Sequence, residues 1–138
     1  YVSTGMSGEE ELEPFLAGLG ASIPPNLLLI HTQLSYEDTD TNLRAIARLR
    51  ERFGVPVAFG SHSTDTNVLY TALGFSPAAL FFYVKGARPI KHRDEEHAIL
   101  LSECPTVIAE IRRLETMMGD GIKREMENRI SGKHYAKK

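Results

Sequence analysis

Short apolar runs alternate along this chain with longer segments whose apolar residues repeat at helical spacing. The predicted strands are residues 1–4, 27–30, 55–59 and 78–84, and a helical segment follows each of them. The run at 27–30 is uninterrupted and apolar, which predicts a strand buried on both faces of a parallel sheet. The pattern therefore predicts four βα units that form a parallel sheet of the α/β class.

The helical segments have recognisable starts and ends. Residues 9–19 begin with three glutamates, which suit the positive end of a helix dipole. Residues 39–53 open with capping residues and end at Gly54, and a shorter helix is predicted at 66–73. The last helix begins near Ser102 and Pro105. Its predicted apolar stripe is Val107, Ile108, Ile111, Leu114 and Met118.

Composition and charge exclude several classes of protein. With 138 residues, 42% hydrophobic and 25% charged, the chain is typical of one globular domain. A formal net charge of −2 gives no field that would attract nucleic acid or an acidic membrane surface. The longest apolar runs are far shorter than the ~20 residues that span a bilayer. The single Cys104 cannot form an internal disulfide, which favours the reducing cytoplasm.

Three segments fall outside the βα pattern. The polar residues 85–96 are long for a plain connection, so we expect a functional loop or lid there. Residues 122–138 are basic and have little apolar periodicity, which predicts a linker or tail. The chain begins with a strand and without an initiating Met, so we expect it to be part of a longer polypeptide.

Two histidines stand where parallel α/β proteins bind ligands. His31 ends one predicted strand and His62 follows the next one, and the carboxyl ends of parallel strands share one edge of the sheet. Two imidazoles at that edge are suitable ligands for Mn, Fe, Co or Zn and leave positions open for substrate and water. A histidine at a strand end is also often a hydrogen-bonded structural residue, so the spacing alone leaves both interpretations open.

Other polar residues have weaker claims to chemistry. Ser3 and Thr4, with Gly5, could present hydroxyl and N–H groups to a phosphate, or simply cap a turn. His92 and His97 lie in the charged loop and suit acid/base or anion contacts, although such charge runs are usually solvated surface.

Several segments, in chain order, match one known family. Residues 1–6 resemble its STGM strand end, residues 28–36 its LLHCTSSYP segment, and residues 42–57 its NLRAI and RFGVPVG run. Residues 58–63 take the place of GYSDHT, and 72–74 that of ALGA. Together these segments resemble the sialic acid synthase (N-acetylneuraminate synthase) family, which condenses phosphoenolpyruvate with an amino sugar on a TIM barrel.

The resemblance implies a fold and a division of the chain. Residues 1–121 would be strands five to eight of a TIM-type (β/α)8 barrel, its C-terminal half, with the N-terminal half-barrel missing. This agrees with the four βα units, since a complete barrel needs about 250 residues. Residues 122–138 would lead towards the family's small antifreeze-like domain. The full-length protein is expected to be a homodimer.

The resemblance also implies site residues and ligands. His31 and His62 would hold a divalent metal, usually Mn, with Mg or Co as alternatives. The metal would act as a Lewis acid on the sugar aldehyde. Phosphoenolpyruvate and the amino sugar would be bound by Ser3, Thr4, Gln33, Ser35 and Tyr36.

The chain departs from the family pattern in ways that bear on activity. Ser61 replaces the aspartate before the second histidine, and residues 82–86 lack the acid and the histidine of the family's EKHFT strand. Its PDH loop survives in part as Glu96 and His97. Two functions therefore remain open: part of a sugar-acid synthase, or a non-catalytic relative that serves as a binding or assembly module. Other metal-dependent chemistry on the same fold is a third alternative.

Overall fold

A four-stranded parallel sheet forms the centre of the protein. The computed structural model describes residues 1–20, 23–32, 34–88 and 91–124. The sheet has the order β1-β2-β3-β4, and every neighbouring pair is parallel. Its strands are β1 (Val2–Ser3), β2 (Leu29–Thr32), β3 (Val57–Gly60) and β4 (Leu80–Phe81). The predicted α/β class with a parallel sheet is confirmed.

The fourth predicted strand is shorter than expected. The prediction of one strand over residues 78–84 is wrong, because β4 ends at Phe81. The last backbone hydrogen bond between β4 and the chain that follows β3 runs from the Ser61 N–H to the Phe81 carbonyl. The chain then pairs elsewhere: β5 (Val84–Lys85) runs parallel to β6 (Ile99–Leu100) in a separate two-stranded sheet. The predicted loop is therefore closed by a pair of short strands, β5 and β6, of which the sequence did not indicate the second.

The helices follow the predicted positions with one clear shift. They are α1 (Glu9–Gly18), α2 (Arg44–Phe53), α3 (Asn67–Ala72) and α4 (Cys104–Met118). The expected start of α2 at residue 39 is wrong, because the 3-10 turn η2 (Asp38–Thr41) comes first and Asn42 then adopts a left-handed conformation with φ of 41°. Gly54, with φ of 66°, ends α2 as predicted. A second 3-10 turn, η3 (Leu73–Phe75), extends α3.

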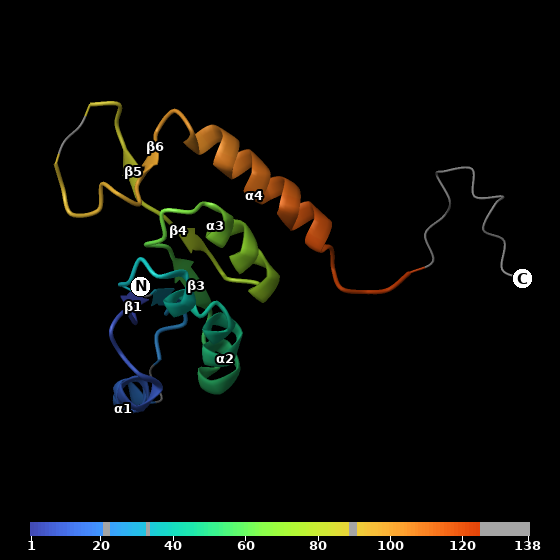
Figure 1. Ribbon diagram of the computed structural model, residues 1–138. Coiled ribbons are helices and arrows are strands. Elements are labelled where there is room, and N and C mark those ends of the chain that lie inside the picture. The colour runs from blue at the N-terminus through green and yellow to red at the C-terminus, as the bar shows by residue number, and fades with distance from the viewer. Residues whose placement is uncertain (21–22, 33, 89–90, 125–138) are drawn as a thin grey trace, which may run out of the picture.

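The helices line one face of the sheet and form the core there (Figure 1). Leu29, Val57 and Phe59 from the strands are almost fully buried against Ile46 of α2 and Leu69 of α3. The predicted stripe of the last helix is correct at Val107 and Ile111, which are buried. It is wrong at Ile108 and Met118, which stay exposed, because α4 contacts the other elements along a narrower face.

The other face of the sheet is open. Ile30 of β2 is only half-buried, so the prediction that this strand is buried on both faces is wrong. The ring of Tyr1, beside β1, packs edge-on against the ring of Phe81 on β4, with centroids 5.8 Å apart. Since β1 and β4 are the two ends of the sheet, this contact shows that the sheet curls toward its open face.

Apart from residues 122–124, the predicted tail at 122–138 lies outside the described residues. Among the helices that the structure describes, none is long and apolar enough to cross a membrane.

Candidate functional site

His62 lies just beyond the carboxyl end of β3, on the open side of the sheet. Its Nδ1 is 3.0 Å from the hydroxyl oxygen of Thr32 at the end of β2, and its Nε2 is 3.4 Å from the hydroxyl of Tyr83. When Nδ1 carries the proton and donates it to Thr32, Nε2 keeps its lone pair. The Thr32 hydroxyl thus orients the His62 ring. The family's aspartate before this histidine, which would supply a carboxylate, is Ser61 here.

The long loop brings His97 against His62. The two imidazole centroids are 4.8 Å apart, and the ring of Tyr83 packs edge-on against His97 at the same centroid distance. Tyr36, from the segment after β2, contacts the His97 ring at 5.8 Å. Four rings from four different connections of the chain therefore meet at this end of the sheet.

His97 is buried and lacks hydrogen bonds. Its side chain is 1% exposed, and neither ring nitrogen has a hydrogen-bond partner among the described residues. The closest carboxylate oxygen belongs to Asp94, 3.6 Å from Nε2, which is too long for a hydrogen bond. Burial lowers the pKa of His97, and the neighbouring His62 lowers it further. The neutral imidazole that results is the form that binds metal ions.

Asp94 completes a group of potential metal ligands. One ligand atom each from His62, Asp94 and His97 lie within 4.8 Å of one another. Two imidazoles and a carboxylate are ligands that divalent transition metals accept, and the unpaired nitrogens of His97 would gain a partner from such an ion. The residues present at this end of the sheet therefore fit a divalent metal.

His31 has different neighbours from His62. Its Nε2 donates to the carbonyl of Thr41 at 3.0 Å, and its ring packs against Phe59, a buried residue of the helix-covered face. Burial lowers the pKa of His31. Since adjacent residues of a strand point to opposite faces, Thr32 rather than His31 faces His62. The pairing of His31 with His62 on one ion stays a prediction, while the structure gives His62 a second set of neighbours.

The predicted substrate-binding residues are placed differently from one another. Ser3 lines a pocket with Thr32 and His62, and Ser35 lines a smaller adjoining hollow with His62. Thr4 is buried and its hydroxyl donates to the Ile30 carbonyl at 3.1 Å, so that donor is engaged within the sheet. Tyr36 contacts His97, as described above. Gln33 lies outside the described residues.

The pocket on the open face has a volume of about 290 Å³. The polar side chains that line it are those of Ser3, Thr32, Ser61, His62 and Tyr83, and the rest of its wall includes Phe81 and Phe82. None of the residues that line this pocket carries a carboxylate. The wall is therefore largely apolar, as expected from the lack of an acid in residues 82–86.

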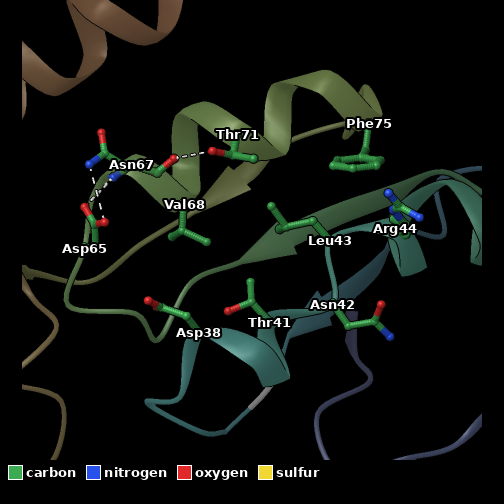
Figure 2. A pocket seen from close by; sticks show the side chains of 10 residues that line it. All are labelled: Asp38, Thr41, Asn42, Leu43, Arg44, Asp65, Asn67, Val68, Thr71 and Phe75. Atoms are coloured by element: carbon green, nitrogen blue, oxygen red, sulfur yellow. Dashed lines mark hydrogen bonds between the residues drawn. The ribbon is translucent and has the colours of Figure 1, made fainter.

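A larger hollow of about 460 Å³ lies between η2, the start of α2 and α3 (Figure 2). Some of its polar groups bond to one another: the Asp65 carboxylate accepts the backbone N–H of Asn67, and the Thr71 hydroxyl donates to the Asn67 carbonyl. This hollow is broad and lacks histidines among its lining residues, so we do not assign chemistry to it.

Sequence reasoning found part of this constellation. It named His62 from its place after a strand, and it named His97 only as one of two histidines in a charged loop. Asp94 was not singled out. The sequence feature that indicates Asp94 and His97 together is their spacing of three residues, because two side chains three apart in one turn can point the same way.

Comparison with known proteins settles the family. The model of the NeuB family matches residues 1–123. The chain belongs to the NeuB family. The predicted resemblance to sialic acid synthases is thereby confirmed.

Individual relatives are sugar-acid synthases. The chain is 28% identical to a pseudaminic acid synthase of Campylobacter jejuni over 124 residues, which cover 87% of this chain and 36% of that protein. It is 24% identical to an N,N'-diacetyllegionaminic acid synthase of Legionella pneumophila over 135 residues, covering 94% and 38% of the two chains. This chain thus spans little more than a third of the length of these relatives.

The fold resembles a solved structure of the same kind of protein. The crystal structure of an N-acetylneuraminic acid synthetase from Leptospira borgpetersenii matches with a TM-score of 0.80 at 21% identity. The match covers 90% of this chain and 44% of that one. At this identity the likeness shows the fold, and it agrees with the parallel α/β architecture described above.

Proposed function

We propose that this chain is part of a synthase that condenses phosphoenolpyruvate with the aldehyde of an amino sugar. The observation that carries the proposal is the NeuB family match over residues 1–123, since the relatives named above are sugar-acid synthases. In the proposed reaction C3 of phosphoenolpyruvate attacks the aldehyde carbon and forms the new C–C bond. Water then adds at C2, and the C2–phosphate bond breaks to release inorganic phosphate.

The open face of the sheet is the proposed place of this reaction. In parallel α/β proteins ligands bind at the carboxyl ends of the strands, and here those ends present Ser3, Thr32 and His62 around one pocket. Ser3 would donate its hydroxyl to the phosphate group, and Ser35 and Tyr36 would contact the sugar. A divalent ion, proposed to be Mn with Mg or Co as alternatives, would supply Lewis-acid polarisation of the aldehyde. His62 would be among its ligands, together with the predicted His31.

We propose further that the sheet is half of a TIM-type barrel, strands five to eight, completed by a partner half-barrel. Three features support this: the parallel order of the strands, the curl that brings Tyr1 to Phe81, and the coverage of about a third of each relative. The full-length enzyme is proposed to be a homodimer. The neutral, apolar wall near Phe82 favours an acceptor other than N-acetylmannosamine, because hydroxyl groups left without partners there would weaken binding.

One observation favours a second function, that of a non-catalytic module. The wall formed by Phe81 and Phe82 offers no acid or base to a bound sugar, although the pocket itself is present. A relative that binds but does not turn over its ligand would keep such a pocket.

The experiment that tests the proposal measures phosphate release by the protein that carries this chain. Phosphoenolpyruvate is supplied with a panel of N-acetylated amino sugars, N-acetylmannosamine among them, and the sugar-acid product is identified by mass spectrometry. We expect release that depends on one sugar of the panel. Saturable sugar binding without any phosphate release would support the module instead. Efficient, selective use of N-acetylmannosamine would show that the altered strand is tolerated and that the expected change of acceptor is wrong.

A further inference from the structure

We propose that Tyr83 is a specificity-determining residue of the pocket on the open face, where its hydroxyl binds an oxygen atom of the acceptor sugar, and that His97 holds its ring in place. The inference rests on the proposed function only for the nature of the ligand, an N-acetylated amino sugar. It gives a role to residues 82–86, the stretch that lacks the acid and the histidine of the family pattern.

The first argument is the place of the Tyr83 hydroxyl. Tyr83 lines the pocket of about 290 Å³ together with Ser3, Thr32 and His62, and it is 40% exposed. Its hydroxyl oxygen is 3.4 Å from Nε2 of His62, which is at the long end of hydrogen-bond distances. A contact of this length is weak, so the hydroxyl can exchange it for a sugar oxygen at a shorter distance.

The second argument is that the other residues of 82–86 cannot make this contact. Phe82 lines the same pocket but is apolar. The Lys85 ammonium donates to the Glu95 carbonyl at 2.6 Å, and Lys85 lines a different pocket on the loop. The two remaining residues of the stretch have no polar side chain. Tyr83 is therefore the residue of this stretch that offers the pocket a hydrogen-bonding side chain.

The third argument is that the other polar side chains of the pocket already have partners or a proposed role. The Thr32 hydroxyl is 3.0 Å from Nδ1 of His62. The hydroxyl of the buried Ser61 accepts a backbone N–H of the following turn at 3.2 Å. Ser3 is proposed to bind the phosphate group. Tyr83 is then the side chain best placed to serve the sugar, because a phenol hydroxyl both donates and accepts hydrogen bonds.

The fourth argument is that the ring of Tyr83 is held from behind. It packs edge-on against His97, with centroids 4.8 Å apart, and its centroid is 5.3 Å from that of His62. The His97 side chain is 1% exposed and also contacts the ring of Tyr36. Among the described residues neither nitrogen of His97 has a hydrogen-bond partner, so its ring acts on Tyr83 by packing. A side chain that packing already orients loses little conformational entropy when a ligand binds.

The composition of the pocket indicates what Tyr83 selects. Its hydroxyl stands beside the apolar rings of Phe81 and Phe82. Mostly apolar walls with a few placed polar groups are typical of sites for small ligands, and the polar groups set the orientation of the ligand. Tyr83 would therefore favour amino sugars that carry an oxygen atom at this point over those that do not.

Isothermal titration calorimetry of the protein that carries this chain tests the inference, with N-acetylmannosamine, N-acetylglucosamine and N-acetylgalactosamine as probes. For the sugar that binds most tightly, Tyr83→Phe should weaken binding about tenfold, because it removes one hydrogen bond and keeps the ring. Phosphoenolpyruvate should bind this variant as it binds the parent. The control Tyr70→Phe removes a hydroxyl from α3, outside the pocket, and should leave both affinities unchanged.

His97→Phe tests the positioning role, because it keeps an aromatic ring beside Tyr83 and removes the two nitrogens that lack partners among the described residues. We expect this variant to bind the sugar as the parent does. His97→Ala, which leaves a gap beside the Tyr83 ring, should bind it about fivefold more weakly. Equal losses in the two variants would overturn the positioning role. Circular dichroism establishes folding, and His97→Leu replaces His97→Ala if the alanine variant does not fold.

The failure of this inference and that of the proposed function are distinguishable. Unchanged sugar affinity in Tyr83→Phe would overturn the inference, and so would a parent that binds none of the three sugars. Sugar-dependent phosphate release with the same KM for the sugar in parent and Tyr83→Phe would leave the synthase standing and overturn only the role of Tyr83. Sugar binding that depends on Tyr83, without phosphate release, would support the inference and refute only the synthase.

Discussion

Gly60 sets how closely β3 approaches β2 beside His62. A methyl group at this position would lie 3.1 Å from the Cγ2 of Ile30 and 3.3 Å from the Cβ of Thr32. Both distances are shorter than ordinary van der Waals contacts, so β2 and β3 would have to move apart. Thr32 is the residue that holds His62, which ties the packing of this glycine to the site.

We therefore expect Gly60→Ala to destabilise the protein by about 1 to 3 kcal/mol through overpacking. Urea unfolding followed by circular dichroism measures the change. Gly74→Ala is the control, because a methyl group there meets nothing within 4 Å and should change stability by less than about 0.5 kcal/mol. Equal stabilities of the two variants would contradict the close approach of the strands.

For single residues, the sequence predicts the place in the fold better than the side-chain contacts made there. His62 could be found because a residue just after a parallel strand lies at the ligand-binding edge. The sequence could not show that Thr32, one residue beyond His31, takes the position facing His62, because the alternation of faces depends on where the strand begins. His97 looked like one solvated charge-run residue among others, and only the fold shows that its ring is buried.

Helices α1 and α2 are joined by an ion-pair network on the surface. Glu9, in the first turn of α1, bonds to both Arg48 and Arg52 of α2, and Arg52 also reaches Glu13 at 2.7 Å. The hydrogen bond from Arg48 is the main cause that lowers the pKa of Glu9 below its ordinary value of 4.5, and Arg52 adds to it. The carboxylate therefore binds protons less readily in the folded than in the unfolded protein.

The sign of the pH dependence follows from this lowered pKa. The stabilisation from Glu9 is present above pH about 4.5 and is lost as the pH falls through the folded-state pKa. We expect Glu9→Gln to have a lower urea midpoint than the parent at pH 7, by a small margin because the pair is exposed, and the two midpoints to converge as the pH falls through the lowered pKa of Glu9. Glu10→Gln, in the same turn, should not show this convergence. A constant difference between parent and Glu9→Gln across the range would contradict the assignment.

At the element scale the sequence predicted which elements form and missed where some of them end. The helix α2 was expected from the spacing of Ile46 and Leu49, and both are buried. Its late start depends on the left-handed Asn42, which hydrophobic periodicity does not indicate. The apolar run at 78–84 suggested one long strand. The length of a strand depends on its pairing with the neighbouring strand, however, and the backbone hydrogen bonds of β4 to the β3 side end at Ser61.

At the scale of the whole molecule, the sheet has a covered face and an open one (Figure 1). The helices bury Leu29, Val57 and Phe59, while the open face leaves Phe81 and Tyr83 at 38% and 40% exposure. Composition and βα order were enough to predict the α/β class, because both are local features of the sequence. Local patterns of this kind do not indicate that one face of the sheet is left open, because that depends on which distant parts of the chain pack together.

An uncovered apolar face with unpaired strand edges predicts association of the 138-residue chain with itself. β1 and β4 are the ends of the described sheet, and such edges pair readily with other strands. Phe81 lies on β4, lines the open pocket and touches Tyr1, so it is positioned to be buried by a second copy. We expect the isolated chain to elute as dimers or larger species whose size increases with concentration, measured by light scattering after gel filtration.

Phe81→Lys should shift the distribution toward the monomer, because burying a charge on that face is unfavourable. Met117→Lys is the control: it places the same charge on α4, where Met117 is 68% exposed, and should leave the distribution unchanged. A chain that stays monomeric at all concentrations would show that the open face needs no partner to remain in solution.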